Sequence, residues 1–266
     1  MHRKILIIDD HDDLATSLGE VFTHVGHDVR VVDNREEAVL IENLDDYDLV
    51  ITDLDGPGPR SVRMNGTHCL PDENKRGSEH IKAFKLCAAN FRRDDFDEDE
   101  LKNMVATVLD YKIRFVDTSQ AVKKIHESIE FELPTAISLM HIVLEYLLKR
   151  VERLGVVNPE QSNLFVALDE AFVNAVKHGN KYDMHKLVRI RAEVSKEEAR
   201  FTIEDEGEGF DVASVPDPLD PENLFKTSGR GVLFIYNIMD EVKYNARGNR
   251  LTMVKRGQSE NLELSE

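Results

Sequence analysis

Short apolar runs that end in acidic residues recur in the first half of the sequence. Residues 4–8 are Lys-Ile-Leu-Ile-Ile and lead into Asp9 and Asp10, and residues 48–53 are Asp-Leu-Val-Ile-Thr-Asp. Such runs are typical of strands buried on both faces of a parallel sheet. Segments with a helical spacing of apolar residues separate them, which predicts βαβ units with right-handed crossovers. The expected order is strand 4–8, helix 12–24, strand 27–32, helix 35–44 and strand 48–53.

Proline and glycine interrupt this pattern between Gly56 and Gly77, and regular periodicity returns after that stretch. Beyond it we expect helix 78–86, a short strand at 89–92 and helix 98–109. Residues 111–122 then form the expected connection to a second domain. The sequence thus predicts a first domain over residues 1–110.

Helices precede most of the strands in the second half, an order that favours an α+β sandwich over residues 123–257. An acidic tail is expected over residues 258–266. The expected elements are strand 125–133, helix 136–154, helix 160–178, strands 187–194 and 200–204, helix 231–239 and strand 250–255.

Composition excludes several classes of protein. The 266 residues carry a net charge of −17, which argues against direct binding of nucleic acid. Two cysteines, Cys69 and Cys87, are too few for a disulfide framework or a zinc knuckle. The sequence has no apolar run long enough to span a membrane and no signal-peptide pattern at its start, so we expect a cytoplasmic protein.

Acidic residues follow two of the expected strands, at Asp9, Asp10 and Asp53. The carboxyl ends of parallel strands meet at the edge where such sheets bind ligands. Carboxylates that converge there need a divalent cation, and their oxygens suit Mg²⁺. One of them would then be able to accept a phosphoryl group.

These residues, with the Pro57 that follows, resemble a two-component receiver domain over about residues 3–110. The resemblance implies a flavodoxin-like, doubly wound parallel sheet in abbreviated form. It implies Asp53 as the phosphoacceptor, Mg²⁺ held by Asp9, Asp10 and Asp53, and an upstream histidine kinase as phosphodonor.

The sequence departs from the receiver pattern at one functional position. Receivers place a lysine and a proline where this chain has Asp94 and Asp95. Without that lysine, a phosphoryl group on Asp53 lacks its expected counter-charge. Two interpretations therefore stay open, a phosphorylatable receiver and a pseudo-receiver that serves as a docking platform.

A polar stripe lies on the otherwise apolar helix expected at 160–178. Glu170, Asn174 and His178 are spaced by four residues, which places them close to one face of the helix. Burial of such a stripe in a dry core is costly, so it is expected to line a wet pocket.

Two glycine-rich segments follow this helix. Asp205 ends a strand and leads into Gly207 and Gly209, where a carboxylate is able to accept from an amine while a ligand approaches the backbone. Residues 228–231 are Ser-Gly-Arg-Gly and begin an apolar helix. A helix N-terminus favours phosphate.

The three motifs together resemble the Bergerat-fold ATPases over about residues 125–256, and within them the anti-sigma factor serine kinases. That resemblance implies ATP and Mg²⁺ as cofactors. Glu170 is the implied general base, Asn174 the Mg²⁺ ligand, and Asp205 the acceptor for the adenine amino group. The remaining residues implied to bind ATP are His178, Gly179, Gly207, Gly209, Gly229, Arg230, Gly231 and Thr252.

The resemblances predict a serine/threonine protein kinase controlled by a receiver-like domain in phosphorelay signalling. The implied substrate is a serine of an anti-sigma-antagonist protein, a sigma factor is a further implied partner, and a homodimer is expected from the family alone. An ATP-binding module that sequesters a partner without catalysis is the alternative. A histidine kinase with His126 as phosphoacceptor is less favoured, because residues 125–133 have the pattern of a strand.

Overall fold

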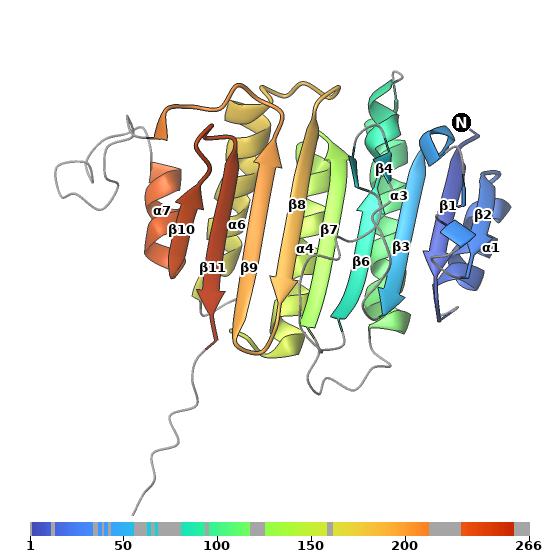
Figure 1. Cartoon of the computed structure of the whole chain (residues 1–266), viewed down its shortest axis with the longest axis horizontal. Helices are drawn as coiled ribbons and strands as arrows, with labels where there is room; N and C mark the ends of the chain where they lie inside the picture. The colour runs from blue at the N-terminus through green and yellow to red at the C-terminus, as the bar shows by residue number, and fades with distance from the viewer. Residues whose placement is uncertain are drawn as a thin grey trace, which may run out of the picture.

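A single mixed sheet of nine strands runs through both halves of the chain (Figure 1). This computed structural model describes residues 2–11, 14–33, 37–38, 40–41, 44–55, 63–64, 67–68, 81–93, 96–117, 126–158, 162–212 and 230–257. The strand order is β10-β11-β9-β8-β7-β6-β3-β1-β2. The strands are β1 (Lys4–Asp9), β2 (Asp28–Val32), β3 (Leu49–Asp55), β6 (Ile81–Cys87), β7 (His126–Pro134), β8 (Leu187–Val194), β9 (Glu198–Asp205), β10 (Glu241–Tyr244) and β11 (Arg250–Arg256). A separate pair consists of β4 (Arg63–Met64) and β5 (Thr67–His68).

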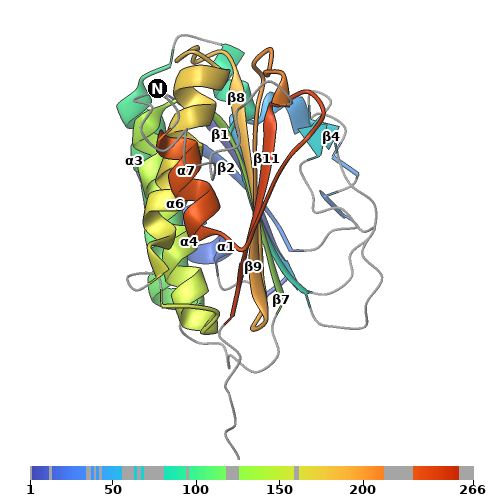
Figure 2. The ribbon, with the colours of Figure 1, turned by 90° about the vertical axis from the view of Figure 1, so that its left-hand side faces the viewer.

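The α-helices of the described residues form a layer on one face of this sheet (Figure 2). They are α1 (Ala15–His24), α3 (Glu98–Tyr111), α4 (Ile137–Leu154), α6 (Leu164–Val173) and α7 (Arg230–Ile238). Shorter turns are η1 (Leu44–Asp46), η2 (Ala89–Arg93), and the π-helical turns η3 (Lys112–Val116) and η4 (Asn174–Gly179) that continue α3 and α6. Across the described ranges, every helix falls short of the length and apolar character that a bilayer crossing requires.

The first three strands have the predicted parallel arrangement, with β1 between β2 and β3. The fourth strand does not continue it. β6 runs antiparallel to β3, so the prediction of a doubly wound, flavodoxin-like parallel sheet is wrong from β6 onward. β6 instead pairs in parallel with β7 and thereby joins the N-terminal strands to the second half of the chain.

The prediction of a helix at 78–86 is wrong, because two lysines have the spacing of a polar face on a helix. Lys82 and Lys85 are three residues apart, yet the segment is the strand β6, on which they point to opposite faces. Lys82 Nζ lies 4.0 Å from Asp53 Oδ2, and Lys85 Nζ lies 3.2 Å from Glu130 Oε2 on the neighbouring strand. These carboxylates allow both lysines to be buried inside a sheet.

The region after β6 also differs from its prediction. The expected strand at 89–92 is the 3₁₀ turn η2. The helix expected at 98–109 is confirmed as α3, which begins where the Asp97 carboxylate accepts a hydrogen bond from Asp99 N at 2.9 Å. Residues 111–117, part of the expected connection, continue this helix. The helix expected at 35–44 lies largely outside the described residues.

The second half has the predicted strands 125–133, 187–194, 200–204 and 250–255, which the structure pairs antiparallel as β7, β8, β9 and β11, with helices on one face (Figure 2). The helices expected at 136–154 and 231–239 are confirmed within two residues, and α6 with η4 covers 164–179 of the helix expected at 160–178. The short strand β10 was not predicted. His126 begins β7, which removes the basis for the histidine-kinase alternative.

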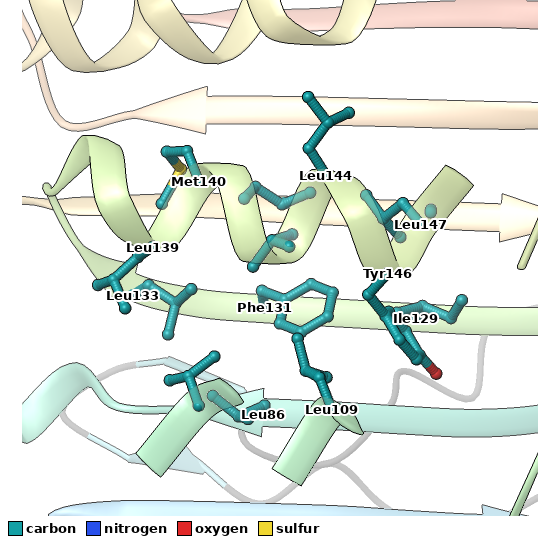
Figure 3. Packing of buried hydrophobic residues seen from close by; sticks show 14 of the residues in the cluster. Leu86, Leu109, Ile129, Phe131, Leu133, Leu139, Met140, Leu144, Tyr146 and Leu147 are labelled. Atoms are coloured by element: carbon teal, nitrogen blue, oxygen red, sulfur yellow. The ribbon is translucent and has the colours of Figure 1, made fainter. Parts of the chain in front are cut away.

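One hydrophobic core crosses the junction between the two halves (Figure 3). Phe131 on β7 is buried and contacts Phe84 of β6 and Tyr146 of α4, with ring centroids 6.0 Å apart in each case. Leu86 of β6 and Leu109 of α3 complete the same layer, as Figure 3 shows. The halves therefore share side-chain packing as well as strand pairing.

We predict that Phe131→Ala lowers the free energy of unfolding by about 3–5 kcal/mol, the usual cost of removing a buried aromatic ring. Because the core is continuous, amide hydrogen exchange should accelerate by similar factors in β1–β3 and in β8–β9. Loss of protection confined to β8–β9 would contradict a shared core.

Candidate functional site

The helix formed by α6 and η4 places two of the predicted polar residues against the sheet. Glu170 and Asn174 are both half-buried. At Asn174 the backbone changes to the π-helical turn η4, a deviation that is common at functional sites. The change of winding interrupts the four-residue stripe, and His178 is exposed.

Asp205 lies in close contact with the C-terminal end of this helix. Its Oδ1 accepts a hydrogen bond from Gly207 N at 2.8 Å. A methyl group on Gly179 would lie 2.3 Å from Asp205 Cγ, and one on Gly207 would lie 2.3 Å from the Gly179 carbonyl oxygen. Any side chain would therefore be expelled, so both positions require glycine.

Burial raises the pKa of Asp205, and the hydrogen bond from Gly207 N opposes this shift without cancelling it. A carboxyl whose pKa is higher in the folded than in the unfolded protein destabilises the native state once the pH rises above the unfolded pKa. Asp205 therefore costs stability at neutral pH. Such a cost is typical of a group that is kept for binding rather than for folding.

The third motif meets the first at the N-terminus of α7. A methyl group on Gly231 would lie 2.1 Å from Glu170 Oε2, so the start of α7 is in contact with the Glu170 side chain. Gly229 and the side chain of Arg230 lie outside the described residues. The structure thus brings Gly231, Asp205 and Gly207 against the helix that carries Glu170 and Gly179.

The two ends of this arrangement differ in chemistry. Glu170 and Gly179 are nine residues apart, a separation of roughly 13 Å along a helix. A buried carboxylate lies at one end and the N-terminus of α7 lies at the other. Between them, Asn174 Nδ2 is buried without a hydrogen-bond partner among the described residues. A buried amide without a partner is costly and indicates a position for a ligand.

These features fit an adenine nucleotide. The carboxylate is an acceptor for an exocyclic amine, the glycines leave room for a flat base, and the helix N-terminus suits phosphate. An amide oxygen such as that of Asn174 is a suitable ligand for Mg²⁺.

One predicted strand residue, Thr252, lies apart from the others. Thr252 lies between the buried Leu251 and Met253, and its hydroxyl is 3.3 Å from that of Thr202 on the sheet face opposite the helices. Asp205 points to the helix face, so the structure does not bring Thr252 together with it.

The sequence did not indicate Asn249, which contacts Asp205. Its Nδ2 donates to Asp205 O at 2.8 Å, and its carbonyl accepts from Asp205 N at 3.0 Å. This pairing follows from the register of the strands, because Asn249 does not belong to any of the three motifs. Gly209, with φ of 77°, turns the chain so that Arg247 reaches the carbonyl of Gly207.

The predicted acids of the N-terminal half do not form one group. Asp9 Oδ2 accepts from the backbone N–H groups of Leu14 at 2.7 Å and Ala15 at 3.0 Å, so it caps α1. Within the described ranges, the group whose potential metal ligands lie within 4.8 Å of one another is Asp9, Asp10 and His11. Asp53 does not belong to that group.

Asp53 pairs with a lysine that the sequence pattern did not indicate. Lys112 Nζ lies 2.7 Å from Asp53 Oδ2, and both side chains are buried. Burial alone lowers the pKa of Lys112, but the carboxylates of Asp53 and Asp117 outweigh it and hold that pKa above its usual value. Lys112 is thus a buried cation beside Asp53, while Asp94 and Asp95 lie outside the described residues.

Lys112 begins a buried chain of ion pairs that reaches the second half of the protein. Its Nζ lies 3.2 Å from Asp117 Oδ1, and Asp117 Oδ2 lies 3.2 Å from Arg150 Nη1 on α4. Arg150 Nε donates to Glu127 Oε2 on β7 at 2.9 Å. We call Asp53, Lys112, Asp117, Arg150 and Glu127 the buried ion chain.

Comparison with known proteins supports the ATPase prediction for the second half. Residues 134–255 match the family model described as a histidine kinase-like ATPase domain. This model does not extend to residues 1–133, so the receiver resemblance of the N-terminal half stays a prediction.

Curated relatives agree with this match. The serine-protein kinase RsbW of Staphylococcus epidermidis is 27% identical to this chain over 135 residues, which cover 48% of this chain and 85% of that protein. The serine-protein kinase RsbW of Staphylococcus aureus (strain Newman) has the same identity and the same coverage. The second half of the chain is thus similar to these serine-protein kinases.

We predict that Lys112→Met lowers the free energy of unfolding by about 3–5 kcal/mol at pH 7, because it removes the nearest cation from the buried Asp53 carboxylate and leaves Lys82 Nζ, 4.0 Å away, as its remaining cation among the described residues. In the wild type the contribution of Lys112 is complete below the unfolded pKa of about 10.4 and is lost only as the pH rises through its raised folded pKa.

Two further variants complete this test in urea unfolding. Asp53→Asn combined with Lys112→Met should recover part of the stability, because the carboxylate that Lys112 neutralises is removed together with it. Lys149→Met, which removes an exposed partner of Glu145, should cost less than about 0.5 kcal/mol. Equal losses for the single and the double variant would contradict the pairing.

Proposed function

We propose that this chain is an ATP-dependent serine kinase of the anti-sigma factor type whose N-terminal half controls its activity. The observation that carries the proposal is the convergence of three glycine-bearing motifs on α6 and η4. Gly179 and Gly207 adjoin Asp205 at one end of this helix, and Gly231 adjoins Glu170 at the other. The similarity to serine-protein kinases supports the same conclusion.

Each end of the site has a role in binding ATP. The Asp205 carboxylate accepts the adenine amino group, with Gly179, Gly207 and Gly209 leaving room for the base. Gly229, Arg230 and Gly231, at the start of α7, bind the phosphates. Asn174 holds Mg²⁺, which neutralises phosphate charge when bound. His178 is placed at the exposed rim.

Glu170 is the general base of the proposed reaction. It removes the proton of a serine hydroxyl as the serine oxygen attacks the γ-phosphorus. The bond between this phosphorus and its bridging oxygen breaks, and ADP leaves with the electron pair. The contact between Glu170 and Gly231 supports this role, because the proton transfer is needed beside the proposed phosphate-binding end of the site.

The proposed protein substrate is a serine of an anti-sigma-antagonist protein, and a sigma factor is a proposed second partner. Both come from the resemblance to the anti-sigma factor kinases, as does a homodimer. Incubation with ATP, Mg²⁺ and candidate antagonist proteins tests the substrate class. Phosphate transfer to serine supports the proposal, and hydrolysis of ATP without transfer would contradict it.

The N-terminal half is the proposed control element, with Asp53 as its phosphoacceptor and an upstream histidine kinase as donor. The pairing of Asp53 with Lys112 favours this over a pure docking platform, because it provides the counter-charge that a phosphoryl group needs. Acetyl phosphate with Mg²⁺ should label wild-type protein but not Asp53→Asn. Equal labelling of both proteins, or of neither, would contradict this role of Asp53.

We predict that Glu170→Gln reduces kcat for serine phosphorylation by about 10²–10⁴, the usual contribution of a general base. Nucleotide affinity should change by less than about threefold, because the amide keeps the size of the side chain. Glu145→Gln, on the exposed face of α4, is the matched control and should leave both parameters unchanged. Full activity of Glu170→Gln would exclude Glu170 as the base.

We predict that Asp205→Asn weakens ATP binding at least about tenfold, through loss of a charged acceptor. The same variant should unfold at an equal or higher temperature without nucleotide, because it removes a carboxylate whose pKa burial raises. In the wild type, ATP affinity should fall as the pH is lowered through the raised pKa of Asp205. Isothermal titration and thermal unfolding measure the two effects, and loss of both binding and stability would instead indicate misfolding.

A further inference from the structure

A residue of the N-terminal half contacts the turn that carries Asp205. Glu206, between Asp205 and Gly207, has its carboxylate between two arginines. Arg92 Nη1 lies 3.1 Å from Glu206 Oε2 and 3.3 Å from Oε1, and Arg189 Nη2 lies 2.9 Å from Oε1. Leu187 N also donates to Oε2, at 3.1 Å. Of these partners of Glu206, Arg92 is the one that lies outside residues 134–255, the segment that matches the ATPase family model.

Hydrogen bonds on two sides hold the turn η2, which contains Arg92, in place. Asn90 Nδ2 donates to the carbonyls of Asp45 at 2.9 Å and Tyr47 at 2.7 Å, which attaches η2 to the N-terminal strands. On the other side, the Arg92 carbonyl lies 2.9 Å from Nδ1 of His185, in the segment between η4 and β8. Both loops that border Asp205 therefore rest on η2.

We propose that Arg92 is a positioning residue for nucleotide recognition. It holds the Glu206 carboxylate, and thereby fixes the backbone of the turn from Asp205 to Gly209 in the geometry that reads the adenine base. This inference rests on the proposed function, because it assigns to the N-terminal half a direct part in the ATP site.

The turn needs such an anchor because it is rich in glycine. Gly207 and Gly209 lose more backbone freedom on ordering than other residues do. The Glu206 side chain is the polar group of the turn that reaches β8 and η2, while its own N–H donates to Asn180 Oδ1 at 2.8 Å. The hydrogen bonds from Leu187, Arg189 and Arg92 outweigh the effect of burial and hold the pKa of Glu206 below its usual value. The carboxylate is thus charged at neutral pH and available to both arginines.

Loss of Arg92 should affect recognition of the base more than global stability. The Arg92 and Glu206 side chains are one quarter exposed, and Arg189 still holds the carboxylate. The expected loss of ATP affinity is therefore moderate, about fivefold. Since Asp205 discriminates adenine by accepting from its amino group, a looser turn should weaken ATP more than GTP. A general loss of stability would weaken both nucleotides alike.

The experiment compares the affinities for ATP and GTP, each with MgCl₂, by isothermal titration of the full chain. The variants are Arg92→Ala, Arg92→Lys and Glu206→Gln. Arg200→Ala is the matched control, because Arg200 pairs with Glu198 at 2.9 Å on the same strand but far from the turn. Thermal unfolding without nucleotide is measured in parallel.

We expect Arg92→Ala to lower both the ATP affinity and the ratio of ATP to GTP affinity, with partial recovery in Arg92→Lys and no change in Arg200→Ala. Glu206→Gln should behave as Arg92→Ala does. Wild-type affinity and selectivity in Arg92→Ala would overturn the inference while leaving the proposed function intact, as would an equal loss for both nucleotides. Failure of the wild type to bind any nucleotide would instead overturn the proposed function, and the inference with it.

Discussion

The buried ion chain is the constraint on which the architecture depends. Removing one charge from water costs several kcal/mol unless a partner compensates for it, and all five members of this chain are buried. Asp53 lies on β3. Lys112 begins η3, and Asp117 follows its last residue. Arg150 lies on α4, and Glu127 lies on β7. None of these elements is able to bury its own charge alone. The pairing therefore requires the N-terminal strands and the ATPase-like half to assemble together, and the continuous β3-β6-β7 segment of the sheet provides the geometry.

The nucleotide site depends on this joint assembly. η2 follows directly after β6, the strand that joins the two halves, and it supports both loops around Asp205 through Arg92. At the other end, α4 carries Arg150 and packs against α6, which carries Glu170 and continues into η4 with Asn174. Each end of the proposed ATP site thus rests on an element that the N-terminal half fixes, which gives proposed control a short physical route.

Local patterns in the sequence predicted the elements well where a single period governed them. The strands of the ATPase-like half and the helix α4 follow alternating or helical apolar spacing, and the three glycine motifs indicated one site. β6 could not be predicted, because its lysines at 82 and 85 are neutralised by Asp53 and Glu130 on other strands. The roles of Lys112, Arg92 and Asn249 were missed for the same reason. Each is defined by a partner that is distant in sequence, and no local motif encodes such a pairing.

The charge balance of the ion chain suggests how Asp53 would act in the proposed control. Three carboxylates of the chain face two cations, and Lys82, 4.0 Å from Asp53, brings the balance to zero. A phosphoryl group on Asp53 would add negative charge to this balanced set. Lys112 would then be drawn towards Asp53 and away from Asp117, which would leave Arg150 as the remaining cation near Asp117. Because Arg150 belongs to α4, a change at Asp53 would reach the helix layer that carries Glu170 without any movement of the sheet.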